Sequence, residues 1–153
     1  MNTNEFKADF QLLDSNVASF VFENKFICIE DDMDLDRQID VEYSTDRLED
    51  YKEYRMGTVT LNVKFSIKEK EDEAKDQRRS CIGDLEISGL FCAQSESIED
   101  DLFNKMLEVN GCATMISLVR AFIISVSAQS IGTGKIILPL LNINQMHEKL
   151  EKK

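Results

Sequence analysis

A strict alternation of apolar and polar residues over residues 58–68 is the feature that most constrains the fold of this chain. Every odd position is a large apolar residue and every even position is polar. The apolar set is Val59, Leu61, Val63, Phe65 and Ile67. Because successive side chains of a strand point to opposite faces, this pattern predicts a β-strand with one buried face and one solvated face.

Three further segments favour strands. Residues 81–92 alternate in the same way, and residues 10–23 and 39–44 are less regular candidates. Gly83 and Gly89 fall on the apolar face of the 81–92 strand, so another part of the chain is expected to approach the backbone there. Since charged segments without a helical pattern connect the strands, the sequence predicts one four-stranded antiparallel sheet.

The period then changes to that of a helix. Ser97 is the expected N-cap of a first helical segment that runs to about Glu108. The pair Asn110-Gly111 is expected to break the helix, because such a pair is typical of helix ends.

A second helix is predicted over residues 113–130, and it is apolar around most of its circumference, with Arg120 as its only charge. One sheet can cover only one side of such a helix, and the chain has no other long helix to cover the rest. The sequence therefore predicts self-association through a seam of small residues. The predicted interface consists of Ala113, Ser117, Ala121, Ser125 and Ala128, together with Ile123.

An apolar segment follows over residues 131–142, and it contains the only proline, Pro139. A short amphipathic helix is predicted after it. These elements together predict an α+β fold in a single domain, residues 1–153: a four-stranded antiparallel sheet packed on a long apolar helix, plus a short C-terminal helix.

Charge and composition exclude several function classes. The 153 residues include 18 Lys+Arg and 29 Asp+Glu, a formal charge of −11, which disfavours nucleic acids and anionic membrane surfaces as partners. Ten acids and two bases lie within residues 30–50, which is typical of a solvated loop or an exposed edge. A calcium loop is the weaker alternative, because the glycine and closing glutamate of an EF-hand are missing.

Compartment and redox state are also indicated. The opening residues have no apolar leader, and the longest uncharged stretch, residues 121–134, is too short to span a membrane. A cytoplasmic protein without membrane insertion is therefore expected. The four cysteines form no C-x-x-C pair, so reduced and largely buried thiols are expected.

Catalytic signatures are missing from the sequence. His147 is the only histidine, and the cysteines lack the paired spacing of a zinc site. Residues 132–135 (Gly-Thr-Gly-Lys) fail the phosphate-loop pattern at the positions of Gln129 and Ile136. No nucleophile elbow or dinucleotide-binding motif is present. We therefore expect a protein that is not an enzyme and that uses no cofactor or metal.

The order of these elements resembles the SecB family of protein-export chaperones. Residues 10–23, which open with Phe-Gln and close with Phe-Glu, are similar to the first strand of that family, and residues 85–91 are similar to its fourth strand. Residues 120–142 resemble the stretch from the helix arginine, through a glycine-containing turn, to Pro139 and Asn142. The Gly-Thr-Gly-Lys turn and the lack of tryptophan mark a divergent member.

The resemblance implies a dimer of dimers, a homotetramer, that acts as an ATP-independent holdase for unfolded polypeptides, either in protein export or for one dedicated client such as an antitoxin. Clients of such proteins lie along apolar grooves. By this resemblance the client-binding residues are Ile136, Ile137, Leu138, Leu140, Leu141, Ile143, Met146 and Leu150.

The outer sheet face of export chaperones docks the motor SecA. By this resemblance the corresponding positions are Ser19, Glu23, Ile82 and Asp84, with Ser19 where an acid is expected. An alternative from another class is a non-catalytic oligomeric adaptor that binds one folded partner through this acidic face.

Overall fold

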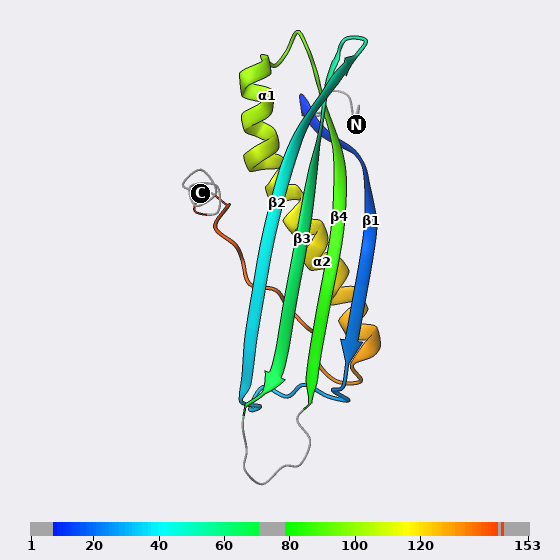
Figure 1. The fold of residues 1–153 in the computed structure, drawn as a ribbon, viewed down its shortest axis with the longest axis vertical. Helices are drawn as coiled ribbons and strands as arrows, with labels where there is room; N and C mark the ends of the chain where they lie inside the picture. Colours follow the sequence, from blue (N-terminus) through cyan, green and yellow to red (C-terminus); the bar gives the residue numbers. More distant parts are fainter. Residues whose placement is uncertain (1–7, 71–78, 144, 146–153) are drawn as a thin grey trace, which may run out of the picture.

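Four long strands form the sheet of this protein. The structure is a computed structural model that describes residues 8–70, 79–143 and 145. The strands are β1 (Phe10–Asn24), β2 (Leu35–Tyr51), β3 (Tyr54–Glu69) and β4 (Ser80–Gln94). They pair antiparallel in the order β1-β4-β3-β2, and a long helix lies on one face of the sheet, called here the inner face (Figure 1). The prediction of an α+β fold with this sheet is confirmed.

The alternation in β3 has the predicted effect on burial. The five apolar side chains of residues 59–67 are between 0% and 7% exposed, while the polar side chains between them point outward. Leu85, Ile87 and Phe91 of β4 are buried beside them on the same face. These two central strands supply the largest part of the core.

Two glycines of β4 allow close packing, as predicted. A Cβ atom on Gly83 would lie 2.3 Å from the ring of Phe65. A Cβ atom on Gly89 would lie 2.4 Å from Sδ of Met115, a residue of the helix. A side chain at either position would therefore push a neighbour out of the core.

Strand β2 is much longer than the predicted strand over residues 39–44. It spans Leu35–Tyr51, so most of the acidic run is an edge strand of the sheet and not a loop. The alternation was obscured because Arg37 and Arg47 occupy positions on the inner face, where an alternating pattern would have apolar residues. The expectation of an exposed acidic edge is confirmed.

The predicted helix break at Asn110-Gly111 is wrong. Helix α1 (Asp100–Met106) continues through a π-helical turn, η2 (Leu107–Gly111), into α2 (Cys112–Ser130). Gly111 has helical dihedral angles (φ −60°, ψ −49°). Its role is to allow packing, since a Cβ atom there would lie 2.8 Å from Cγ2 of Val59.

The start of the helix also differs from the prediction. The N-cap is Glu99 and makes no side-chain capping bond, whereas Ser97 lies in a turn where its N–H donates to the Gln94 carbonyl. The two acids Asp100 and Asp101 occupy the first turn, where they are favourable near the positive helix end. The continuous helix of 31 residues has the length and composition of a membrane span, but one side of it packs on the sheet as a core helix does.

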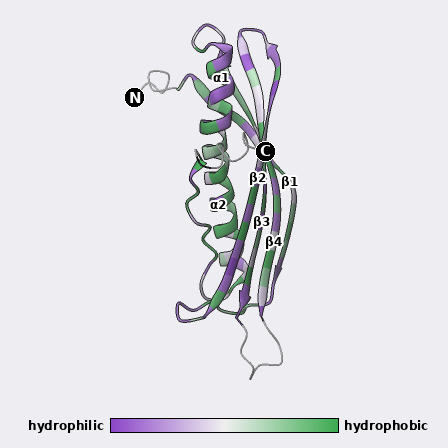
Figure 2. Ribbon diagram, turned by 60° about the vertical axis from the view of Figure 1, so that its left-hand side comes forward, coloured by the Kyte–Doolittle hydropathy of each residue, from purple (hydrophilic) through white to green (hydrophobic). Residues whose placement is uncertain are grey.

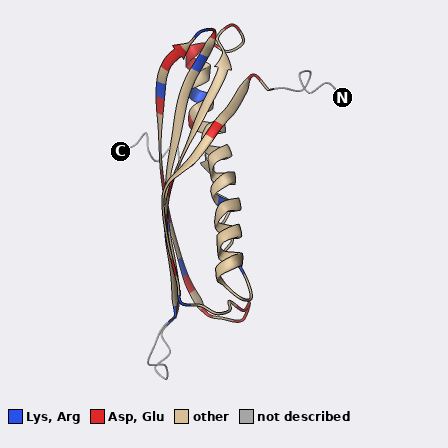
Figure 3. Ribbon diagram, turned by 90° about the vertical axis from the view of Figure 1, so that its right-hand side faces the viewer, with Lys and Arg blue, Asp and Glu red and all other residues tan. Residues whose placement is uncertain are grey.

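Helix α2 buries one side against the sheet. Its buried residues are Cys112, Met115, Ile116, Val119, Ile123 and Ser127. Ile123 is 1% exposed, which corrects its predicted place in the intermolecular interface: its side chain lies in the core of its own chain. Figure 2 shows the apolar helix facing the sheet, and Figure 3 shows how few charges it carries compared with the strands.

The four cysteines, all within the described residues, form no disulfide; Cys28 is half-buried and the other three are buried, as predicted. Burial raises the pKa of the Cys81 and Cys112 thiols to about 11. These thiols are therefore uncharged at neutral pH and behave as small apolar core residues.

Candidate functional site

The segment after α2, residues 131–143, is called here the linker, and backbone contacts fix its first half. The Gly132 N–H donates to the Ile27 carbonyl (2.8 Å), and the Ile29 N–H donates to the Thr133 carbonyl (2.9 Å). Gly134 has a positive φ of 93°, and a Cβ atom there would lie 2.6 Å from the Ile29 carbonyl oxygen. The glycine turn therefore lets the chain reverse direction against the crossover between β1 and β2.

Ser127 attaches the next part of the linker to α2. Its hydroxyl accepts a hydrogen bond from the Ile136 N–H (2.9 Å) and donates one to the Ile124 carbonyl (3.2 Å). The side chain of Ser127 is fully buried. The Ser127 hydroxyl thus provides an acceptor for the buried Ile136 N–H of the linker, which has no helical or strand partner among the described residues.

Side chains of the linker alternate between the core and solvent. Ile136 and Leu138 are 4% and 6% exposed, which corrects their predicted place among the client-binding residues, because both pack in the core. Ile137 and Leu140 are 57% and 84% exposed. Leu141 and Ile143 are half-buried at the edge of the core, and the predicted Met146 and Leu150 lie outside the described residues.

Strand β2 lies beside the linker and adds further apolar surface. Leu35, Ile39 and Val41 are half-buried on its inner face, and Figure 1 shows the linker returning along this side of the sheet. We call these three residues, with Ile137, Leu140, Leu141 and Ile143, the linker surface. The sequence alone pointed to the linker residues of this surface and missed Leu35, Ile39 and Val41. The alternation of Ile39 and Val41 was visible, but Arg37 interrupts its continuation to Leu35.

A pocket of about 360 Å³ lies at one end of the linker surface. Ile29, Ile67, Ile136 and Ile137 give it apolar walls. Its charged rim consists of Glu30, Asp31, Arg37 and Lys135. Such a lining suits a large apolar side chain of a polypeptide, with polar groups at the mouth to accommodate its backbone.

The outer sheet face brings together the four residues predicted to contact a folded partner. Glu23 of β1 lies opposite Ile82 of β4, and Asp84 and Ser19 follow along the same face. Ile82 is 40% exposed, and the Asp84 carboxylate is 4.0 Å from the Lys64 amine. The arrangement is a mixed apolar and acidic surface on solvated strands.

The predicted helix seam lies on the side of α2 away from the sheet. Ser117, Ala121, Ser125 and Ala128 are exposed, and Ala113 is half-buried. A row of small side chains at this spacing permits close approach of a second helix. The described chain leaves this side of α2 uncovered.

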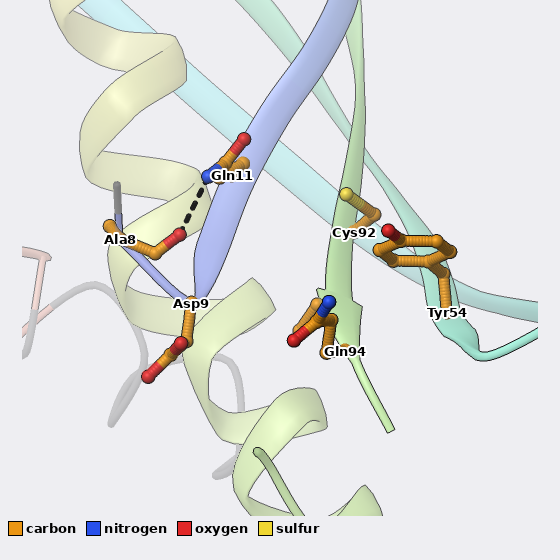
Figure 4. Close-up of a pocket in the computed structure, with 7 residues that line it drawn as sticks. Ala8, Asp9, Gln11, Tyr54, Cys92 and Gln94 are labelled. Carbon is orange, nitrogen blue, oxygen red and sulfur yellow. Dashed lines mark hydrogen bonds between the residues drawn. The ribbon is translucent and has the colours of Figure 1, made fainter. Parts of the chain in front are cut away.

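A second pocket, of about 260 Å³, opens between the start of β1 and the end of β4 (Figure 4). Asp9, Gln11, Tyr54 and Gln94 line it with the Cys92 thiol. Within residues 8–70, 79–143 and 145, no group of three His, Cys, Asp or Glu side chains is placed to hold a metal ion.

Comparison with known proteins places the fold. No protein-family model matches the chain, and no curated protein matches it in sequence at a significant level. The chain is similar in structure to Rv1957, a SecB-like chaperone of Mycobacterium tuberculosis solved in complex with a ChAD peptide from the HigA1 antitoxin. The TM-score is 0.61 at 14% identity, over 88% of this chain and 91% of that one.

A protein of unknown function from Streptococcus agalactiae is also similar, with a TM-score of 0.46 and 9% identity over 86% of this chain and 97% of that one. The similarity to Rv1957 shows that the fold of this chain is SecB-like, as its sequence pattern indicated.

Proposed function

We propose that this SecB-like chain is a chaperone without catalytic activity that holds non-native polypeptide segments on its linker surface. The observation that carries the proposal is the exposure of Ile137 and Leu140 beside the half-buried inner face of β2. Burial of such apolar surface contributes about 25 cal/mol per Å² without any need for a specific partner sequence. The negative charge of the chain, −11, favours solubility of a loaded complex.

Aggregation of a chemically denatured client, diluted into buffer without nucleotide, tests this proposal. The wild-type protein is expected to suppress aggregation, and the double variant Ile137→Asp/Leu140→Asp is expected to lose most of this suppression. The matched control is Leu13→Asp/Leu102→Asp, which places the same charges on exposed leucines outside the linker and β2. If the linker variant protects the client as well as wild type, the linker surface is not the binding site.

We further propose that the client is one dedicated protein, an antitoxin, as an alternative to the precursors of protein export. The support is that the SecB-like chaperone Rv1957 was solved with an antitoxin peptide. Pull-down of partners from the native host separates the two, since a dedicated chaperone would retain one dominant polypeptide.

The outer sheet face is the proposed contact for a folded partner such as a SecA-like motor, or for the single partner of an adaptor. Glu23→Lys with Asp84→Lys is expected to abolish capture of that partner and to leave aggregation suppression unchanged. Competition by a denatured protein for this capture would exclude the adaptor alternative.

Self-association into a dimer of dimers is proposed through the exposed seam of α2. The seam residues and the uncovered side of the helix support it. Cytoplasmic location without membrane insertion is proposed with it, because a second copy packed on α2 would leave that helix no apolar face for a membrane.

A further inference from the structure

The free edge of β2 is suited to pairing with another strand. β2 is the last strand of the sheet, and within the described part of the chain no backbone hydrogen bond leads from residues 35–51 to any segment other than β3. The pairing of β2 with β3 is regular from Leu35 to Leu48, with a register shift only beyond Leu48. The outward N–H and C=O groups of such an edge form a template for an added strand.

The two sides of this edge differ in chemistry. The inner side carries the half-buried Leu35, Ile39 and Val41, which belong to the linker surface. The outer side carries a row of exposed acids: Asp36, Asp40, Glu42 and Asp46. Among the described residues Asp40, Glu42 and Asp46 form no ion pair, and Lys64, which lies opposite Asp40, has its amine 4.0 Å from Asp84 instead.

We propose that an extended client segment adds to the edge of β2 as a fifth strand, with apolar side chains toward the linker surface and basic side chains toward the acidic row. This inference rests on the proposed function and names the client segment that the same site prefers. Because side chains of a strand alternate between its two faces, the preferred segment alternates apolar and basic residues with a period of 2.

The edge of β1 is less suited to this role. Two register shifts, between Leu12 and Asp14 and between Val17 and Ser19, interrupt its pairing with β4. Such bulges twist an edge and hinder the addition of a strand. The acidic row of β2 also repels a second copy of β2, so charge complementarity favours a basic client segment over self-pairing at this edge.

Binding of labelled peptides of 14 residues tests the inference, because the regular part of β2, Leu35–Leu48, is 14 residues long. One peptide alternates Leu and Lys, a second has the same composition in two blocks, and a third alternates Leu and Glu. Wild-type protein is expected to bind the Leu/Lys alternation about tenfold more tightly than the other two at low salt, and the preference over Leu/Glu is expected to fade at high salt.

Charge reversal on the protein locates the contact. Asp40→Lys/Glu42→Lys is expected to weaken binding of the alternating Leu/Lys peptide about tenfold and to favour the Leu/Glu peptide. Glu96→Lys/Asp101→Lys, the same charge change on exposed acids outside the sheet, is the control and is expected to retain the wild-type preference. N-methylation of alternate amides tests strand pairing, since only one of the two sets of alternate amides faces β2 and should abolish binding.

The outcomes separate this inference from the proposed function. If wild type binds alternating and blocked peptides equally, and only Ile137→Asp/Leu140→Asp weakens binding, the linker surface is the site and the β2-edge inference is overturned. Equal tolerance of both N-methylated sets would overturn it as well. If wild type binds no peptide and suppresses no aggregation, the proposed function itself fails.

Discussion

Ser127→Ala is expected to release the linker from α2 without disturbing the sheet. The serine hydroxyl is the acceptor for the Ile136 N–H at 2.9 Å, and both groups are buried. The substitution removes one oxygen and leaves the Ile136 N–H without an acceptor. An unsatisfied buried donor of this kind destabilises a protein by about 1–3 kcal/mol.

Urea unfolding measures the global loss of stability, and amide hydrogen exchange measures the local release of the linker at Ile136. The free energy of unfolding should fall by about 1–3 kcal/mol, and 1–2 kcal/mol of local destabilisation should raise the exchange rate at Ile136 about 5- to 30-fold. Ser130→Ala is the matched control, because Ser130 is exposed at the end of the same helix and its hydroxyl donates to the Val126 carbonyl within that helix, at 2.9 Å. Equal stability of the two variants, with unchanged exchange at Ile136, would refute the assignment of Ser127 as the attachment point of the linker.

Two further predictions concern the core. Ile123→Asp should unfold the chain, because it buries an unpaired charge in the core between sheet and helix at a cost of several kcal/mol. Ala121→Asp on the exposed seam should keep the circular dichroism spectrum of the wild type and change only the elution volume in gel filtration. A folded Ile123→Asp protein would contradict this prediction. The buried Cys81 and Cys112 thiols have a pKa raised from 9.0 to about 11, so the folded chain keeps protons that the unfolded chain releases. The free energy of unfolding should therefore fall as the pH rises from about 9 to 11, and less steeply in Cys81→Ala/Cys112→Ala; identical slopes would show that these thiols contribute nothing.

The sheet could be predicted from the sequence because its central strands have one buried face and one solvated face. In residues 58–68 the two faces of the strand produce an unbroken alternation of polar and apolar residues. β2 was underestimated because Arg37 and Arg47 stand on its inner face and interrupt the pattern. The continuation of the helix through Gly111 could not be predicted for another reason. This glycine is needed because the helix packs closely against Val59 of β3, and such a tertiary contact is not visible in the local sequence.

The candidate site was predicted in its location but not in its details. An apolar linker is visible in the sequence, yet which of its residues turn inward depends on tertiary contacts such as the hydrogen bond between Ser127 and Ile136. The structure places Ile136 and Leu138 in the core and leaves Ile137 and Leu140 outside. Likewise the small-residue seam was recognisable from its spacing, whereas Ile123 could be assigned to the core only once the side of α2 that meets the sheet was known.

The π-helical turn has a consequence for how this gene can change. Along the helix the buried side chains Phe103, Leu107, Cys112 and Ile116 are separated by four, five and four residues. The step of five is the one that the π turn at Leu107–Gly111 accommodates, so the residues on both sides of it still face the sheet. Elsewhere in an α-helix, loss of one residue rotates all that follows by about 100°. Loss of Asn110 would instead leave a step of four and an ordinary helix, so this turn is a position where evolution can remove one codon and keep the core aligned.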